Sequence, residues 1–111
     1  MITVKNKSEF LSSFSNYCLF EVRGVSLSNK MEFISALARV LKLPPYVSNW
    51  DGLIDEMRGL YKLDVEKIII IIYTNPEKNK FLSDLSEVVE TVNEFLKDFN
   101  KEIIIAVSEV K

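Results

Sequence analysis

The chain has 111 residues, of which 48% are hydrophobic and 27% are charged, and its formal net charge is −2. This length and composition predict one domain with one packed core, and they exclude a disordered chain. No basic stripe runs along the sequence, which argues against direct binding of nucleic acid. Histidine is absent, so the commonest general base and the commonest transition-metal ligand are both missing.

A single cysteine, Cys18, excludes an internal disulfide, as is typical of proteins in a reducing cytoplasm. It lies in an apolar run, so we expect a buried and inert thiol. The most apolar run is the five isoleucines at 68–72, far short of the roughly 20 residues that a membrane span needs. The N-terminal residues do not resemble a secretion signal. We therefore expect a cytoplasmic protein with no membrane association.

The first part of the chain predicts a helix, a strand and a second helix, preceded by a short β-like piece. Residues 2–4 have β character, and Phe10, Leu11 and Phe14 share one face of a short helix that we expect to cover one end of the core. Residues 17–24 predict a strand that Gly24 ends.

The second helix is predicted over residues 29–41. Asn29 and Glu32 resemble a capping box at its start, and Pro44 and Pro45 prevent its continuation. Its expected buried face consists of Met31, Ile34, Leu37, Ala38 and Leu41.

The second half of the chain continues the alternation of strands and helices. Residues 66–73 contain the five isoleucines without any alternation, which indicates a central strand covered on both faces. A long helix is predicted over about 78–99 and a last strand over 103–107. The order predicts an α/β fold: a single small domain in which a three-stranded parallel sheet with right-handed crossovers is packed with helices.

Between these elements, residues 43–61 predict a short helix with two different sides. The apolar side carries Trp50, Leu53, Ile54, Met57, Leu60 and Tyr61. The opposite side carries Asp51, Asp55 and Arg58, with Gly52 and Gly59 beside the carboxylates. Each glycine costs a helix about 1 kcal/mol relative to alanine. Two glycines on the polar side suggest that a large molecule must approach the backbone there.

This stretch resembles the barstar family, the intracellular protein inhibitors of bacterial ribonucleases. The resemblance rests on Leu43-Pro44-Pro45-Tyr46, on Asn49-Trp50-Asp51-Gly52-Leu53-Ile54-Asp55, and on Gly59 four residues later. It implies the same three-stranded parallel sheet with helices packed about it. By this comparison residues 1–16 are an addition in front of the family's domain, and the whole chain, 1–111, is one domain.

The resemblance also implies which residues bind a partner. Two carboxylates would occupy the phosphate subsites of a nuclease and accept charge-assisted hydrogen bonds from its basic side chains. Asp55 would enter the active site most deeply, with Asp51 beside it. Tyr46 would pack against a catalytic base, and Gly59 would permit close backbone contact. The full predicted set is Tyr46, Asn49, Asp51, Gly52, Asp55, Gly59 and, from the last helix, Glu94.

The resemblance therefore predicts a monomeric, non-catalytic inhibitor without a cofactor, whose partner is a basic secreted or toxin nuclease. Each residue also has a structural explanation. Asp51, Asp55 and Glu94 could belong to solvated acidic faces, the first two softened by Arg58. Tyr46 could cover the Pro-Pro turn, and Gly59 could simply end the helix.

Two other functions remain open at the sequence level. Asp51, Asp55 and Glu56 could hold Mg²⁺ in an enzyme, although no phosphate-binding glycine loop or nucleophile motif accompanies them. Alternatively, the chain could be a barstar-like immunity module against a toxin that is not a ribonuclease. Ile54 and Leu60 favour this second alternative, because they stand where the family carries large aromatic side chains.

Overall fold

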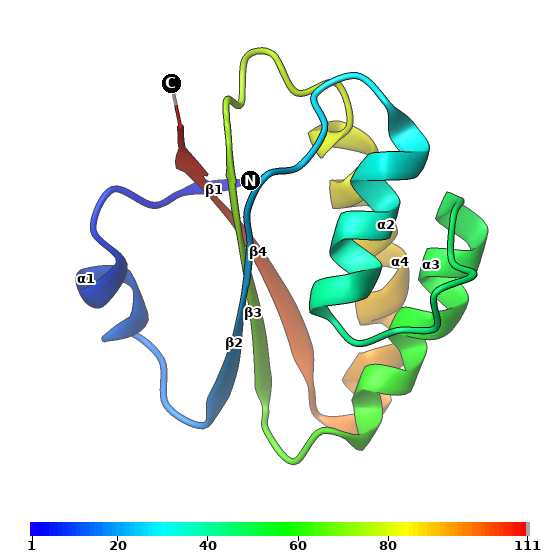
Figure 1. Ribbon diagram of the computed structural model, residues 1–111. Helices are drawn as coiled ribbons and strands as arrows, with labels where there is room; N and C mark the ends of the chain where they lie inside the picture. The colour runs from blue at the N-terminus through cyan, green and yellow to red at the C-terminus, as the bar shows by residue number, and fades with distance from the viewer. Residues whose placement is uncertain (111) are drawn as a thin grey trace.

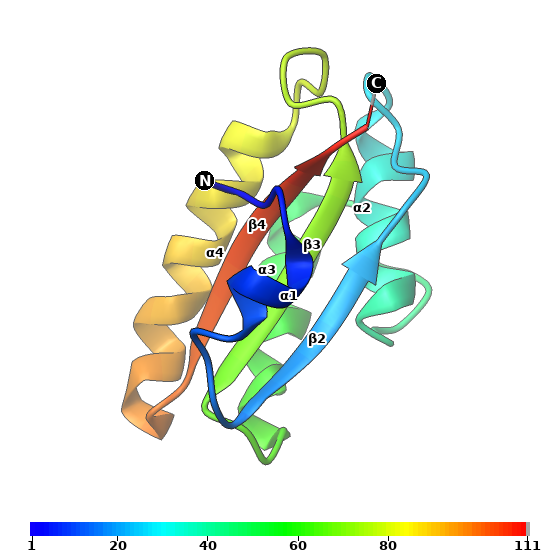
Figure 2. The ribbon, with the colours of Figure 1, turned by 90° about the vertical axis from the view of Figure 1, so that its left-hand side faces the viewer.

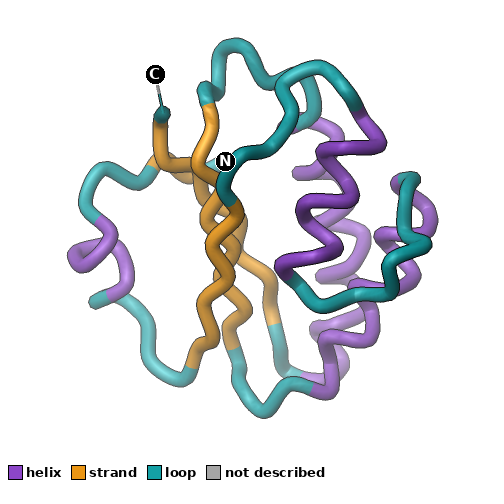
Figure 3. Tube along the Cα trace, in the orientation of Figure 1, coloured by secondary structure: helices purple, strands orange, loops and turns teal. Residues whose placement is uncertain are grey.

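A computed structural model describes residues 1–110 of the chain. Its centre is a four-stranded sheet in which every neighbouring pair of strands is parallel and the spatial order is β1-β4-β3-β2. The strands are β1 (Ile2–Thr3), β2 (Tyr17–Val22), β3 (Lys67–Thr74) and β4 (Glu102–Glu109). Figures 1 and 3 show the sheet nearly edge-on with helices on both sides.

The helices alternate with the strands along the chain, as the sequence predicts. They are α1 (Lys7–Leu11), α2 (Lys30–Val40), α3 (Trp50–Met57) and α4 (Leu82–Leu96). Two 3-10 turns, η1 (Arg58–Lys62) and η2 (Lys97–Phe99), continue α3 and α4. The predicted α/β class in a single small domain is therefore present.

The sheet has four strands where the sequence predicts three. The extra strand, β1, is only two residues long, and Ile2 and Thr3 pair with Ala106 and Val107 of β4. The backbone N–H of Val4 adds a hydrogen bond to the carbonyl of Val107 at 2.7 Å. Two residues with exposed side chains carry no periodic pattern, so only this pairing identifies them as part of the sheet.

Strand β3 is buried on both faces, which confirms the interpretation of the isoleucine run. Ile68, Ile70 and Ile72 belong to the larger core, while Ile69 and Ile71 belong to a smaller core on the opposite face. All five isoleucines are 0% exposed. In the sheet, Ile70 pairs with Phe20 of β2 and with Ile105 of β4.

The two faces of the sheet are covered very differently. Helices α2, α3 and α4 lie on one face, and α1 alone lies on the other (Figures 1 and 2). Phe10, Leu11 and Phe14 pack with the smaller core. The prediction that this segment covers one end of the core is therefore wrong, because it covers the second face of the sheet.

A small polar network connects this N-terminal segment to the sheet. Glu21 Oε1 accepts hydrogen bonds from Lys7 Nζ at 2.9 Å and from Tyr73 Oη at 2.6 Å. The hydrogen bond from Tyr73 is the largest cause of a lowered pKa at Glu21, and the bond from Lys7 is the second, because both stabilise the ionised carboxylate.

Two helices differ from the sequence prediction in detail. In α2, Met31 is 60% exposed, and Phe33 is the residue fully buried in its place. Helix α4 begins at Leu82 rather than near residue 78. The helix begins later because two asparagine side chains bind the backbone before it. Asn75 Oδ1 accepts hydrogen bonds from the backbone N–H groups of Glu77 and Lys78, and Asn79 Oδ1 accepts one from the backbone N–H of Phe81. Such side-chain bonds compete with helix formation. Over residues 1–110, no helix has both the length and the apolar character to cross a membrane.

The burial of β3 predicts where stability resides. Replacement of Ile70 by Ala should lower the free energy of unfolding by about 2–5 kcal/mol, because it leaves a cavity in a fully packed core. Urea unfolding followed by circular dichroism measures this loss. Ile2→Ala is the matched control, since Ile2 is 46% exposed at the sheet edge. An equal loss for both variants would contradict the assignment of β3 as the centre of the core.

Candidate functional site

The candidate site is on α3, the helix farthest from the sheet (Figure 1). This helix packs on α2 and α4 and thereby leaves its outer side in solvent. Leu53, Met57 and Leu60 are buried and hold α3 and η1 on the core. Trp50 is half-buried, with its ring centroid 6.2 Å from that of Phe33. The two-sided helix that the sequence predicts is therefore formed, except that Tyr61, expected on the apolar side, is 37% exposed.

The start of α3 is fixed by local hydrogen bonds. Asn49 is the N-cap, and its Oδ1 accepts from the backbone N–H of Gly52 at 2.7 Å. This bond satisfies one of the free N–H groups in the first helical turn. Asn49 therefore has a clear structural role in setting the direction of α3, whatever contact it makes with a partner. Asp51 lies in that first turn, where the helix dipole favours a negative charge.

The two predicted carboxylates lie on the solvent side of α3, one turn apart. Asp51 and Asp55 are both exposed, and the Asp55 side chain keeps 71% of its surface in solvent. Arg58 Nη1 lies 3.3 Å from Asp55 Oδ1. An exposed pair of this kind contributes at most about 1 kcal/mol, so a partner can displace Arg58 at little cost.

Tyr46 and Glu56 form a contact that sequence reasoning missed. Tyr46 is 72% exposed, yet its Oη donates to Glu56 Oε1 at 2.8 Å. This hydrogen bond to a carboxylate is the main reason that the pKa of Tyr46 is raised. Ten residues separate the two side chains, so no helical spacing could have paired them. The bond holds an exposed aromatic ring beside the acidic face.

The two glycines have different surroundings. A Cβ added at Gly52 would lie 3.2 Å from Asn49 Oδ1, so the tight N-cap itself accounts for this glycine. A Cβ added at Gly59 would meet nothing within 4 Å. The fold therefore gives Gly59 no steric reason to lack a side chain, and its role in close approach of a partner stays a prediction.

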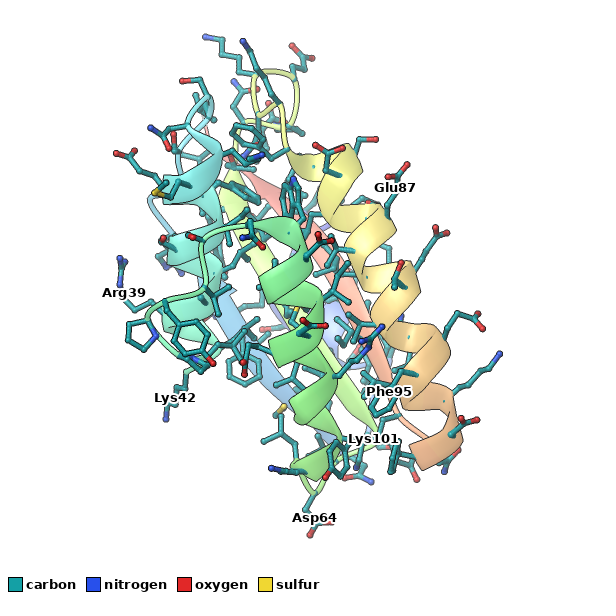
Figure 4. All side chains as sticks on the ribbon, turned by 90° about the vertical axis from the view of Figure 1, so that its right-hand side faces the viewer. Arg39, Lys42, Asp64, Glu87, Phe95 and Lys101 are labelled. Atoms are coloured by element: carbon teal, nitrogen blue, oxygen red, sulfur yellow. The ribbon has the colours of Figure 1, made fainter. Side chains whose placement is uncertain are left out.

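Glu94, the predicted contact from α4, is not brought to the acidic face by any contact in the structure. Its Oε2 binds Lys97 Nζ at 2.7 Å on the same helix, and its side chain is 75% exposed. The neighbouring residue Phe95 instead contacts the end of α3: the Arg58 guanidinium lies 6.0 Å from its ring centroid. Figure 4 shows Phe95 between α4 and the end of α3. A role for Glu94 in partner binding stays a prediction.

A groove between α3 and α4 adds acidic residues that the sequence did not single out. The volume of this groove is ≈ 470 Å³. Asp84 and Glu87 line it from α4, together with Trp50 and Ile54 from α3. Glu87 points outward from α4 in Figure 4. Because α4 is distant from α3 in the sequence, only the packing of the two helices reveals that Asp84 and Glu87 lie beside Trp50 and Ile54.

The arrangement offers little to the magnesium alternative. Two of its three proposed ligands already have partners, Asp55 with Arg58 and Glu56 with Tyr46. Over residues 1–110, no three His, Cys, Asp or Glu side chains are grouped so as to hold a metal ion.

The family model described as barstar (barnase inhibitor) matches residues 17–108. The chain belongs to the barstar family. No curated protein and no solved structure gives a significant match. The match includes α3 with its carboxylates, whereas residues 1–16, which form β1 and α1, precede it. That these residues are an addition to the barstar domain stays a prediction.

The glycine environments predict a difference between two otherwise identical substitutions. Gly59→Ala should stabilise the protein by up to about 1 kcal/mol, because alanine is the better helix former and the added methyl group meets open space. Gly52→Ala should stabilise it less, or destabilise it, because the methyl group pushes on the Asn49 cap. Thermal unfolding of both variants measures the difference. A larger stabilisation from Gly52→Ala would contradict the cap explanation.

The bond between Tyr46 and Glu56 predicts a titration. The pKa of Tyr46 should lie above the ordinary tyrosine value, because deprotonation loses the hydrogen bond and places two negative charges together. NMR of tyrosines labelled with ¹³C at the ring Cζ, recorded as pH rises, measures each residue separately. Glu56→Gln should lower the pKa of Tyr46 and leave that of Tyr73, which burial raises, unchanged. No change at Tyr46 would show that the bond is absent in solution.

Proposed function

We propose that this barstar-family protein inhibits a ribonuclease by inserting the acidic face of α3 into the basic active site of the enzyme. The observation that supports this most directly is the exposure of Asp51 and Asp55 on one side of a helix whose other side is firmly buried. The family match gives the kind of partner, because its members are described as inhibitors of barnase.

The physical basis is imitation of RNA. A ribonuclease binds the phosphates of its substrate with cationic side chains, and carboxylate oxygens accept hydrogen bonds from the same donors. The chain itself would perform no chemistry. Its carboxylates would occupy the phosphate positions and exclude the substrate.

The structure supports this mechanism because the acidic face is held in place before binding. The Asn49 cap fixes the start of α3, Leu53 and Met57 anchor its buried side, and the Tyr46 hydroxyl is bonded to Glu56. A preorganised surface loses less conformational entropy on association than a flexible one. Gly59 leaves the backbone at the end of the helix open to a partner.

A second candidate function is immunity against a toxin that is not a ribonuclease. Ile54 is half-buried and Leu60 is 5% exposed, so neither provides the large exposed aromatic surface that the family has at these positions. The partner could therefore differ while the acidic helix is kept. In both cases we propose that the protein acts in the cytoplasm as a monomer and needs no cofactor.

Co-expression in bacteria tests the function. Cells producing each of a panel of small basic ribonucleases, barnase among them, should survive when the chain is co-expressed with the correct enzyme. Purified chain should then block RNA cleavage by that ribonuclease at a one-to-one ratio. Protection against a toxin without ribonuclease activity, and against no ribonuclease, would favour the second candidate. Failure to protect against any of these would contradict both.

Removal of the charge of Asp55 tests whether this residue contributes most to the proposed interface. Asp55→Asn should weaken binding of the neutralised ribonuclease by about 2–5 kcal/mol or more, a magnitude known from complexes that include barnase–barstar itself. Isothermal titration or stopped-flow kinetics at several salt concentrations measures the change. The association rate of the unchanged protein should fall steeply with salt because the attraction is electrostatic.

Glu9→Gln is the matched control, since it changes the net charge equally but lies on α1, across the sheet from α3. Equal weakening by both substitutions would indicate a general charge effect and would contradict a site on α3.

A further inference from the structure

Three aromatic side chains meet where α3 and α4 end. Tyr61 of η1 lies against Phe99 of η2, with ring centroids 4.6 Å apart, and Phe95 of α4 contacts both, at 6.3 Å from Tyr61 and 5.2 Å from Phe99. We call these three residues the aromatic cluster. The spacing of the rings is that of favourable aromatic pairs.

The aromatic cluster is packed but not covered. Tyr61 is 37% exposed and Phe99 is 43% exposed, whereas Phe95 is half-buried and packs on the main core. Isolated exposed apolar residues are ordinary on protein surfaces, but neighbouring aromatic rings that expose their surface together are characteristic of binding sites. The cluster contributes to the core through Phe95, while Tyr61 and Phe99 extend beyond what the core needs.

The aromatic cluster is continuous with the acidic face of α3. Arg58 connects the two, because its guanidinium contacts Asp55 at 3.3 Å and lies 6.0 Å from the centroid of Phe95. Tyr61 follows on η1, the direct continuation of α3. A partner that covers Asp55 and displaces Arg58 therefore lies at the edge of the cluster.

The charges around the cluster indicate what the partner should present there. Arg58 lies 6.0 Å from the ring centroid of Phe95 and Lys62 lies 5.8 Å from that of Tyr61, so a basic partner must displace these two cations before its own side chain reaches the rings. Aromatic faces attract guanidinium and ammonium groups, most strongly when water is excluded. A basic partner that approaches the carboxylates carries such groups by its nature.

We propose that the aromatic cluster is a second part of the partner interface, in which Tyr61 and Phe99 pack against an arginine or lysine side chain beside the ribonuclease active site. This inference rests on the proposed function and deepens it. The carboxylates speed association with any basic cleft, because long-range charge acts before contact. Packing on the rings requires a side chain at one defined place, so the cluster lengthens the life of the complex and selects among basic ribonucleases.

Kinetics separate the two parts of the interface. The probe is the ribonuclease that the chain neutralises in the co-expression panel, with barnase tried first. Tyr61→Ala and Phe99→Ala should each accelerate dissociation by about tenfold, and the double variant more, while the association rate and its dependence on salt stay unchanged. Asp55→Asn in the same experiment should reduce the salt dependence of association and also accelerate dissociation, because it leaves cationic groups of the partner without their charged neighbour.

Met31→Ala is the matched control, because Met31 is an apolar residue on α2 that is even more exposed, at 60%, than the two rings. Urea unfolding of each variant identifies any loss of folding, and Tyr61→Phe, which keeps the ring, should retain slow dissociation. Unchanged dissociation in folded Tyr61→Ala and Phe99→Ala variants, with binding still sensitive to Asp55→Asn, would overturn this inference alone. Absence of binding to every ribonuclease would instead overturn the proposed function.

Discussion

Five consecutive isoleucines at the centre of a parallel sheet require apolar cover on both sides, and the rest of the structure follows from this requirement. Neither face of β3 tolerates water, because all five side chains are 0% exposed. Helices α2 and α4 cover one face directly, and α1 covers the other (Figures 1 and 2). Burial of this apolar surface is the main source of stability that a domain of this size can have.

The position of α3 is a consequence of this layering. With α2 and α4 against the sheet, α3 packs on their outer side and needs an apolar surface on only one side. Its opposite side is free of packing constraints and can carry Asp51, Asp55 and an open backbone at Gly59. A rigid scaffold thus presents a charged surface whose geometry does not depend on the partner, which favours rapid and specific association.

The surface around α3 combines two kinds of interaction with different physical roles. In the proposed complex, the exposed carboxylates would attract a basic partner over a distance that salt shortens, and they would contribute most once the partner excludes water from them. The exposed rings of Tyr61 and Phe99 act only on contact. Arg58 lies between the two and bonds to Asp55 in the free protein. In the proposed complex, the carboxylates would favour any basic cleft, whereas substitutions at the rings would change which basic partner is bound.

The sequence by itself determined the class of the fold and the two-sided nature of α3, because both follow from local periodicities of apolar residues. It also determined the central position of β3, because an apolar run without alternation indicates a strand covered on both faces. It also determined the barstar relationship, through Tyr46, Asp51, Asp55 and Gly59 at fixed offsets. Only the tertiary structure decided that β1 joins the sheet, since two exposed residues carry no pattern and are identified by their pairing with β4. It alone joined Tyr46 to Glu56 and brought Phe95 of α4, rather than Glu94, against the end of α3. The contact of Arg58 with Phe95 depends on how α4 packs against the end of α3, and that of Tyr46 with Glu56 depends on how the turn before α3 lies against the helix. Spacing along one element encodes neither contact.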